Sequence, residues 1–201
     1  MPKPFSDSER AYIKNRLMEE AQTCLMQFGM RKTTIDELVK RVNIPKGTFY
    51  LFYPSKELLF FDVFCALHEE LQSTFIRWID ELGDNINVDT VTELLFRLYK
   101  QTDATFIYSF IANGDLELLV RKLPSEVAAA HARKDDFNME RLLSQLPGVR
   151  TDGNIEIFSA VLRAIFCIML HKWEVGENVF DDVIRVIVRG VVIQLFEGEP
   201  L

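Results

Sequence analysis

Two short helical patterns separated by about three residues most constrain what this chain can fold into. Thr34 and Glu37 have the spacing of a capping box. The apolar residues that follow recur at helical spacing: Ile35, Leu38, Val39 and Val42. Asn43 is one of the few non-glycine residues that tolerate a left-handed turn, and Pro45 suits the first turn of a second helix over 46–52. This is the pattern of a helix-turn-helix, whose second helix enters the major groove of DNA.

The rest of the chain shows helical periodicity too, and its nine glycines and seven prolines fall mostly where that periodicity breaks. Ser6 and Glu9 have capping-box spacing at the start of a first helix, which Gly29 ends. The inward stripe of that helix is Ile13, Leu17, Ala21, Cys24 and Phe28. Further helices are expected over residues 55–83, 90–101, 104–112, 116–121, 125–145, 154–173 and 178–196. The last segment is rich in β-branched residues, but its polar positions repeat at helical spacing, so the sequence predicts an all-α protein.

Charge is divided unevenly along a chain whose net charge is −7. Residues 1–56 hold ten Lys and Arg against six Asp and Glu, a net charge of +4, which leaves −11 for residues 57–201. Such an asymmetry directs one end of a protein toward a polyanion. We therefore expect two domains, a basic head of residues 1–56 and an acidic body of residues 57–201.

Cysteine usage and hydropathy indicate the compartment. Cys24, Cys65 and Cys167 form no CxxC and have no metal-ligand spacing, which is typical of free thiols in a reducing environment. The N-terminus lacks the apolar segment of a signal peptide, and the most apolar stretch, 155–170, is interrupted by charges and too short to span a bilayer. The sequence predicts a cytoplasmic protein without a membrane partner.

The run TTIDELVKRVNIPKGTFYLFYPSKELL, which begins at Thr33, resembles the signature of the tetracycline-repressor (TetR) family of bacterial transcriptional regulators. The family pattern is T-x-x-x-I-A-x-x-A-G-V-S/P-K-G-T-x-Y-x-H/Y-F-x-S-K-E-x-L. The resemblance covers roughly residues 8–60, and KGTFY followed by PSKE is its most specific part. It implies a three-helix helix-turn-helix head that binds DNA and a C-terminal helical body that binds a ligand and dimerises.

The same resemblance implies which residues face DNA. The implied contacts are Thr34, Lys46, Gly47, Thr48, Tyr50 and Lys56. Thr34 and Lys56 would contact phosphates from the second and fourth helices. The others combine a cation, a bare backbone and hydroxyls, which suit phosphates and base edges.

The chain departs from the family pattern at three positions. Asn43 replaces the common turn glycine, and Leu51 replaces a frequent His or polar residue, where it contacts either a thymine methyl or a sugar. Tyr53 stands where Phe is usual, which favours a structural role. Phe49 and Phe52 are expected in the core, where most aromatic residues of such a stretch lie.

The last two expected helices, 154–173 and 178–196, are apolar nearly all round, which suits helices buried against both their own subunit and a second one. Ala160, Ala164 and Gly190 are small enough to let helices approach closely. We therefore expect a homodimer through these two helices. Its two heads would reach successive major grooves of operator DNA, about 34–36 Å apart.

The middle helices are rich in aromatic residues, and an apolar pocket with a few polar groups is what a small-molecule sensor requires. The candidate lining residues are Phe64, Trp78, Tyr99, Asp103, Phe106, Phe110, Phe158, Arg163 and Phe166. The effector would be a small apolar or aromatic molecule. The alternative is that these aromatic side chains simply fill a core.

No GxSxG, P-loop or GxGxxG occurs, so neither an enzyme nor a cofactor is expected. Cys65 with His68, and Cys167 with His171, lack an evident third ligand, so no metal site is expected. We expect a sequence-specific repressor that its effector releases from the operator. The alternatives are an activator or ligand-independent DNA binder of the same fold, and a helical protein-interaction module that has lost DNA binding.

Overall fold

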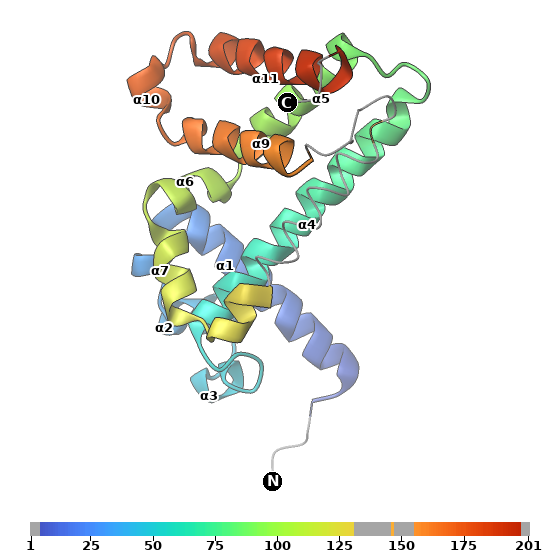
Figure 1. The fold of residues 1–201 in the computed structure, drawn as a ribbon. Helices are drawn as coiled ribbons and strands as arrows, with labels where there is room; N and C mark the ends of the chain where they lie inside the picture. The colour runs from blue at the N-terminus through green and yellow to red at the C-terminus, as the bar shows by residue number, and fades with distance from the viewer. Residues whose placement is uncertain (1–4, 131–145, 147–154, 198–201) are drawn as a thin grey trace. The chain divides into compact units, whose positions relative to one another are not determined.

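Helices joined by turns make up residues 5–130, 146 and 155–197, the part of the chain that this computed structural model describes (Figure 1). They are α1 (Asp7–Lys32), α2 (Ile35–Val42), α3 (Lys46–Phe49), α4 (Lys56–Leu82), α5 (Val88–Asp103), α6 (Phe106–Ala112), α7 (Asp115–Lys122), α9 (Ile155–Met169), α10 (Lys172–Val175) and α11 (Phe180–Glu197). These residues contain no strand, and the all-α prediction is confirmed. None of the described helices is long and apolar enough to cross a membrane.

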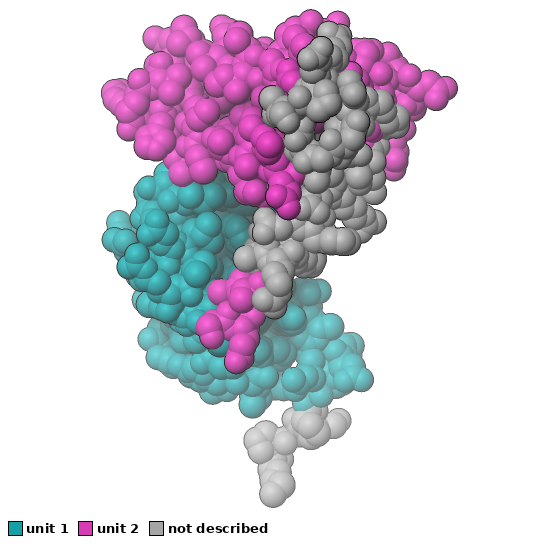
Figure 2. Space-filling view, viewed as in Figure 1, with its two compact units in different colours: residues 1–69, 105–124 teal, residues 70–104, 125–201 magenta. Residues whose placement is uncertain are grey.

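The chain divides by packing into two compact units (Figure 2). Unit 1 comprises residues 1–69 and 105–124, and unit 2 comprises residues 70–104 and 125–201. α6 and α7 thus pack against α1 in unit 1, although they follow the whole of α5 in the chain. The division at residue 56 was expected on functional grounds, and it stays a prediction.

The first helix begins as its capping box predicts. The Ser6 N–H donates to Glu9 Oε2 at 2.7 Å, and the Glu9 N–H donates to Ser6 Oγ at 3.3 Å. Four residues of the predicted stripe are buried: Ile13, Leu17, Ala21 and Cys24. The expectation for Phe28 was wrong, because this side chain is 45% exposed and lies under the Arg41 guanidinium, 5.7 Å from its ring centre.

Gly29 breaks α1 without ending it. Its backbone has φ 72° and ψ 174°, a conformation that L side chains rarely adopt. The chain then resumes a helical turn as far as Lys32, with Met30 buried. The predicted end of the first helix is therefore a kink, followed by a short junction that leads to α2.

The turn between α2 and α3 has the predicted geometry. Asn43 adopts φ 58° and ψ 49°, and it is the one non-glycine residue of positive φ among the described residues. Its N–H donates to Lys40 O at 3.3 Å, and the Ile44 N–H donates to Val39 O at 3.0 Å. These bonds satisfy the last carbonyls of α2 and turn the chain into the next helix.

The recognition helix is shorter than the predicted 46–52. α3 ends at Phe49, and residues 50–52 continue as tight turns. The Leu51 and Phe52 N–H groups donate to carbonyls three residues earlier, at 3.1 and 3.0 Å, and Pro54 follows. A proline disfavours helical backbone in the residue before it, so the helix stops ahead of that position.

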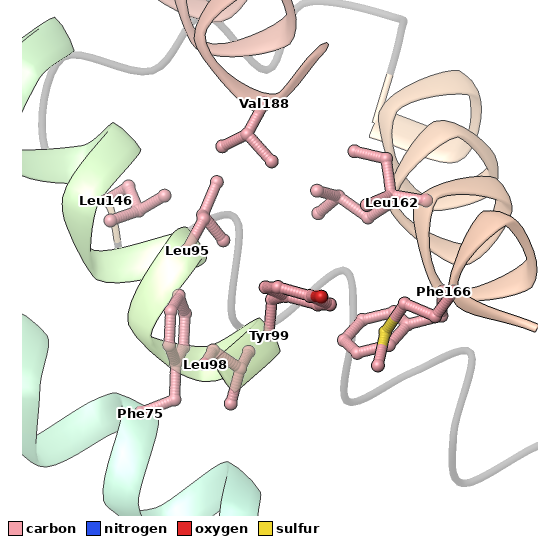
Figure 3. Close-up of a pocket in the computed structure, with 10 residues that line it drawn as sticks. Phe75, Leu95, Leu98, Tyr99, Leu146, Leu162, Phe166 and Val188 are labelled. Atoms are coloured by element: carbon pink, nitrogen blue, oxygen red, sulfur yellow. The ribbon is translucent and has the colours of Figure 1, made fainter. Parts of the chain in front are cut away.

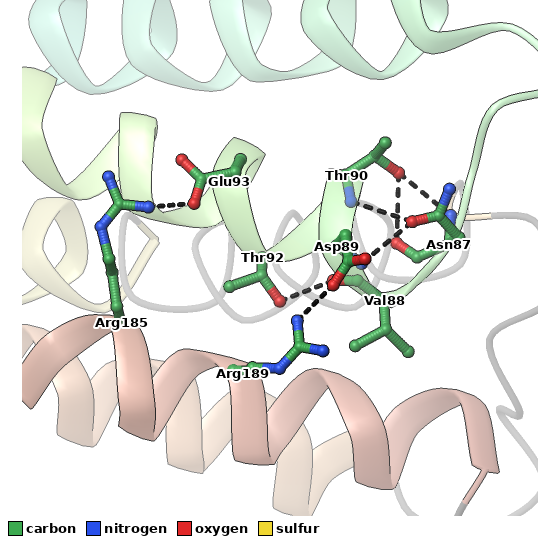
Figure 4. A network of polar contacts seen from close by, with 8 residues as sticks. All are labelled: Asn87, Val88, Asp89, Thr90, Thr92, Glu93, Arg185 and Arg189. Atoms are coloured by element: carbon green, nitrogen blue, oxygen red, sulfur yellow. Dashed lines mark hydrogen bonds and ion pairs between the residues drawn. The ribbon is translucent and has the colours of Figure 1, made fainter. Parts of the chain in front are cut away.

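α11 is a helix, as predicted, and it packs along α5 in unit 2. Polar pairs join the two helices: Arg189 with Asp89, Arg185 with Glu93, and Lys100 with Asp181 (Figure 4 shows the first two). The predicted helix over 154–173 is two helices, α9 and α10, because the chain turns at residues 170 and 171. The helix predicted over 125–145 is present at 125–130 and otherwise lies outside the described residues.

We predict that Asn43→Ala lowers the free energy of unfolding by about 1 kcal/mol, because alanine lacks the short polar side chain that lets asparagine tolerate left-handed backbone. Asn43→Gly, the matched control, should stay within about 0.5 kcal/mol of the wild type, since glycine tolerates positive φ. Urea denaturation of the three proteins measures both values. Equal losses in the two variants would show that the Asn43 side chain, and not its backbone, stabilises this turn.

Candidate nucleic-acid interface

An open surface groove of about 360 Å³ in unit 1 gathers most of the residues predicted to face DNA. Thr34 from the start of α2, Lys46 and Tyr50 from α3 and its end, and Lys56 from the start of α4 all line it. The other lining residues are Ile35, Asp36, Pro54, Ser55 and Glu57. Local pattern places each predicted residue at a helix end, and packing brings those ends to one opening.

Thr34 caps α2 at the edge of this groove. Its hydroxyl accepts from the Glu37 N–H at 3.2 Å, which is one of the two bonds of the predicted capping box. Thr34 is exposed, and unpaired N–H groups at a helix N-terminus attract anions. The same position thus supplies a hydroxyl and a favourable dipole.

Lys46 has an acidic partner that the sequence reasoning missed. Its Nζ lies 2.8 Å from Asp36 Oδ1, and this hydrogen bond raises the pKa of Lys46. The Lys46 and Asp36 side chains are 51% and 74% exposed, and exposed pairs of this kind contribute little stability. Asp36 therefore holds the Lys46 ammonium at the groove through a weak ion pair, which another anion such as a phosphate can displace.

α3 and the turn that follows it expose several of the residues that the sequence predicts to face DNA. Gly47 is exposed, and a Cβ added there would meet no atom within 4 Å. Thr48 is half-buried, and Tyr50 is 50% exposed, with its ring edge-on to the fully buried Phe49 at 5.5 Å. Leu51 is 59% exposed and forms no part of the core. Phe49 thus anchors this turn while its neighbours face outward.

Lys56 is engaged by the protein itself. Its Nζ donates to Thr33 O at 2.7 Å and to Met30 O at 3.3 Å, and burial lowers the pKa of this half-buried group. The ammonium therefore holds the junction between α1 and α2. Its predicted phosphate contact stays a prediction.

Tyr53 lies in the core of unit 1 rather than on the groove. The side chain is 4% exposed, and its hydroxyl donates to Asp62 Oδ2 at 3.1 Å, while Lys14 lies 3.6 Å from the same oxygen. Burial raises the pKa of Tyr53. These contacts join α1 and α4 to Tyr53, which follows the tight turns after α3.

Unit 2 contains a small apolar cavity of about 50 Å³ between α4, α5, α9 and α11 (Figure 3). Its lining residues are Phe75, Leu95, Leu98, Tyr99, Leu146, Leu162, Ile165, Phe166, Met169 and Val188. Tyr99 and Phe166 belong to the predicted pocket set. The others were missed because a buried aliphatic residue that lines a cavity has the same pattern as one that fills a core. The Tyr99 hydroxyl donates to Asp181 Oδ1 at 3.3 Å, a polar group beside the cavity.

The remaining seven residues of the predicted pocket lie away from this cavity. Within unit 1 the Phe110 ring packs against Phe64 and Phe106, with ring centres 6.3 and 5.7 Å apart. In unit 2 the Trp78 ring lies 4.0 Å from the Arg97 guanidinium, and Asp103 pairs with Lys172 at 3.2 Å. Phe158 is buried and Arg163 is exposed. None of these seven lines the cavity, and their contact with an effector stays a prediction.

A family model described as bacterial regulatory proteins of the tetR family matches residues 17–63, which include α2, α3 and the groove. The HTH-type transcriptional regulator YhgD of Bacillus subtilis is 39% identical over 59 residues, which are 29% of this chain and 31% of YhgD. The negative regulator IcaR of the biofilm operon icaADBC, from Staphylococcus epidermidis, is 26% identical over 103 residues, 49% of this chain and 52% of IcaR. The chain thus matches about a third to a half of the length of these relatives.

The fold is similar to that of Thermus thermophilus FadR, a transcriptional repressor of the TetR family whose structure was solved in complex with lauroyl-CoA. The TM-score is 0.61 at 22% identity, with 94% of this chain and 95% of FadR covered. At that identity the likeness is one of fold. The head sequence, residues 17–63, therefore matches the tetR family of bacterial regulatory proteins, and the fold of the described chain is similar to that of a solved member of this family.

Proposed function

We propose that this protein is a sequence-specific DNA-binding repressor of transcription. The observation that carries the proposal is the groove of unit 1, where Thr34, Lys46, Tyr50 and Lys56 converge from three helices. Phosphate contacts fix the register of such a protein on the duplex, and base-edge contacts supply specificity. Thr34 and Lys46 suit the first role, and Thr48 and Tyr50 at the end of the short α3 suit the second.

The proposal of repression rests on sequence similarity to a known negative regulator and not on a structural feature of this protein. IcaR, which is 26% identical to this chain over 103 residues, is a negative regulator of transcription. A protein that occupies an operator overlapping a promoter excludes polymerase without any catalytic step. Activation would require a surface that recruits polymerase, and no observation here favours one.

We predict that selection of random duplexes by the purified protein enriches one palindrome, and that its affinity falls steeply as salt is raised. Tyr50→Ala should then weaken binding to this selected operator by about tenfold, since a good base contact contributes about 1–3 kcal/mol. Tyr12→Ala is the matched control, because Tyr12 is 66% exposed on α1 and does not line the groove. It should bind like the wild type.

Fluorescence anisotropy with the selected duplex measures these affinities. If no sequence is enriched by the folded protein, the proposal fails and a protein-interaction module becomes the better reading. If Tyr12→Ala and Tyr50→Ala weaken binding equally, the groove is not the surface that reads DNA.

We propose further that the protein acts as a homodimer through α9 and α11. Each of these helices exposes small and apolar side chains on one face. On α9 these are Ile157, Ala160, Ala164 and Cys167, and on α11 they are Val186, Gly190 and Ile193. Val186 is 72% exposed, which is costly for an apolar residue in water unless a partner covers it. A two-fold axis would place the same faces against each other and bury both.

We predict that Ala164→Glu converts the dimer into monomers, because it places a charge in the apolar face. Ala11→Glu, a change of the same kind at an exposed position of α1, should leave the dimer intact. Light scattering coupled to size-exclusion chromatography gives the molar mass of each variant. A wild-type mass equal to one chain would refute the dimer outright.

The effector proposed for unit 2 is a small apolar or aromatic molecule. The cavity there is apolar and has one polar group beside it, the Tyr99 hydroxyl paired with Asp181. Its volume of about 50 Å³ is far below the roughly 300–1,000 Å³ of typical ligand pockets. Binding therefore requires the lining helices to move apart. That movement is the means by which a ligand would favour one conformation of the protein over another.

We predict that an apolar effector raises the melting temperature and lowers operator affinity by about 5- to 150-fold, the usual range of allosteric coupling. Leu162→Trp fills the cavity and should abolish both responses while operator binding is retained. A screen of apolar and aromatic compounds by thermal shift, followed by operator dissociation kinetics, tests this. Compounds that bind and leave the operator off-rate unchanged would favour the ligand-independent alternative.

A further inference from the structure

Asp115 is a buried carboxylate at the start of α7 that accepts a hydrogen bond from a different helix, α1. It is 3% exposed and lies in unit 1, 85 residues along the chain from its partner Met30. The N-cap of α7 is Gly114, and no side chain caps this helix. Instead, Asp115 Oδ2 accepts from the Met30 N–H at 2.9 Å. The carboxylate thus stabilises the kink of α1 and leaves the end of its own helix uncapped.

The fit around this carboxylate is close. A Cβ added at Gly29 would lie 3.2 Å from Asp115 Oδ2, a tight contact for real side chains. Arg31 Nε lies 3.7 Å from Asp115 Oδ1 and supplies an opposite charge. Gly29 therefore provides both the left-handed backbone and the space that bring the Met30 N–H to Asp115.

The same short junction is held from its other side by Lys56. The ammonium bonds the carbonyls of Met30 and Thr33, and the Thr33 hydroxyl donates to Gly29 O at 2.8 Å. Thr33 is 1% exposed, so the end of the junction is buried as well. The next residue is Thr34, which caps α2 and lines the groove. A carboxylate from α7 and an ammonium from α4 thus hold the segment that leads into α2.

We propose that Asp115 is a positioning residue for DNA recognition, although it lies outside the head sequence and does not line the groove. By holding the Met30 N–H it sets the path of residues 29–33, and so the place of Thr34 and the N-terminus of α2 beside a phosphate. This inference rests on the proposed function. Residues 105–124 then contribute to DNA recognition, and the buried hydrogen bond from Met30 to Asp115 is one of the contacts that join them to the rest of unit 1.

Three variants test the role of Asp115 on the selected operator. Asp115→Ala removes the acceptor and should weaken operator binding by about tenfold, within the range of known couplings. It should also reduce the slope of log affinity against log salt by about 1, the share of one phosphate. Asp115→Asn keeps an acceptor oxygen at the same place and should bind within about threefold of the wild type. Glu117→Ala is the control, because Glu117 lies in the same turn but is exposed and pairs only locally, with Arg121.

Asp115→Glu keeps the protein measurable if the alanine variant fails to fold. It keeps a carboxylate for the Met30 N–H, but the added methylene must displace the closely packed junction. Affinity and salt slope should therefore fall while the protein stays folded at the temperature of the binding assay. All affinities are measured well below the melting temperatures, where a loss of stability alone leaves binding unchanged. Wild-type affinity and slope in Asp115→Ala or Asp115→Glu would overturn the inference. Absence of any selected operator for the wild type would instead defeat the proposed function.

Discussion

The burial of Phe49 is the interaction on which the candidate interface depends. α3 has only four residues, and a helix of one turn is not stable by itself in water. Phe49 is fully buried and gives this turn a fixed place, while the left-handed Asn43 on one side and the tight turns before Pro54 on the other set its direction. Gly47 and Tyr50 can therefore stay exposed to a partner without loss of order. The packing of Phe49 and of the neighbouring turns therefore fixes the position of α3, which has few hydrogen bonds of its own.

Two lysines of the same groove illustrate how packing separates residues that the sequence treats alike. Lys46 is exposed and paired with an exposed carboxylate, so its charge remains available. Lys56 is half-buried and bonded to two carbonyls at the end of α1, so its charge compensates a helix terminus. A basic residue near a helix end can keep its charge available to a partner or can bond the carbonyls of that end. The burial of its side chain, which the sequence does not show, distinguishes the two roles. The net charge of the head thus overstates the charge that faces outward.

Unit 2 separates its polar and apolar contacts by helix face. α11 directs Asp181, Arg185 and Arg189 to partners on α5, and it directs Val186 and Ile193 to the surface. The polar pairs fix the register of α11 on α5, and Arg185 also covers the Phe96 ring at 3.8 Å. Val186 and Ile193 lie on the side of α11 that faces away from its buried residues, where the proposed second copy would cover them. Between these helices the cavity remains small, so any effector must displace packed side chains in order to enter.

Local sequence determined the helices, their caps and the turn of this protein, because those features depend on residues three or four apart. The Ser6 capping box, the helical face of α11 and the left-handed Asn43 were all readable in this way, and so was the set of groove residues through its family resemblance. Tertiary structure alone decided which distant groups meet. The bond from Met30 to Asp115, the exposure of Phe28 and the membership of the cavity follow from how helices pack, and no short-range pattern encodes that packing. A buried hydrogen bond between residues far apart in the chain forms only after the apolar faces have brought its two partners together.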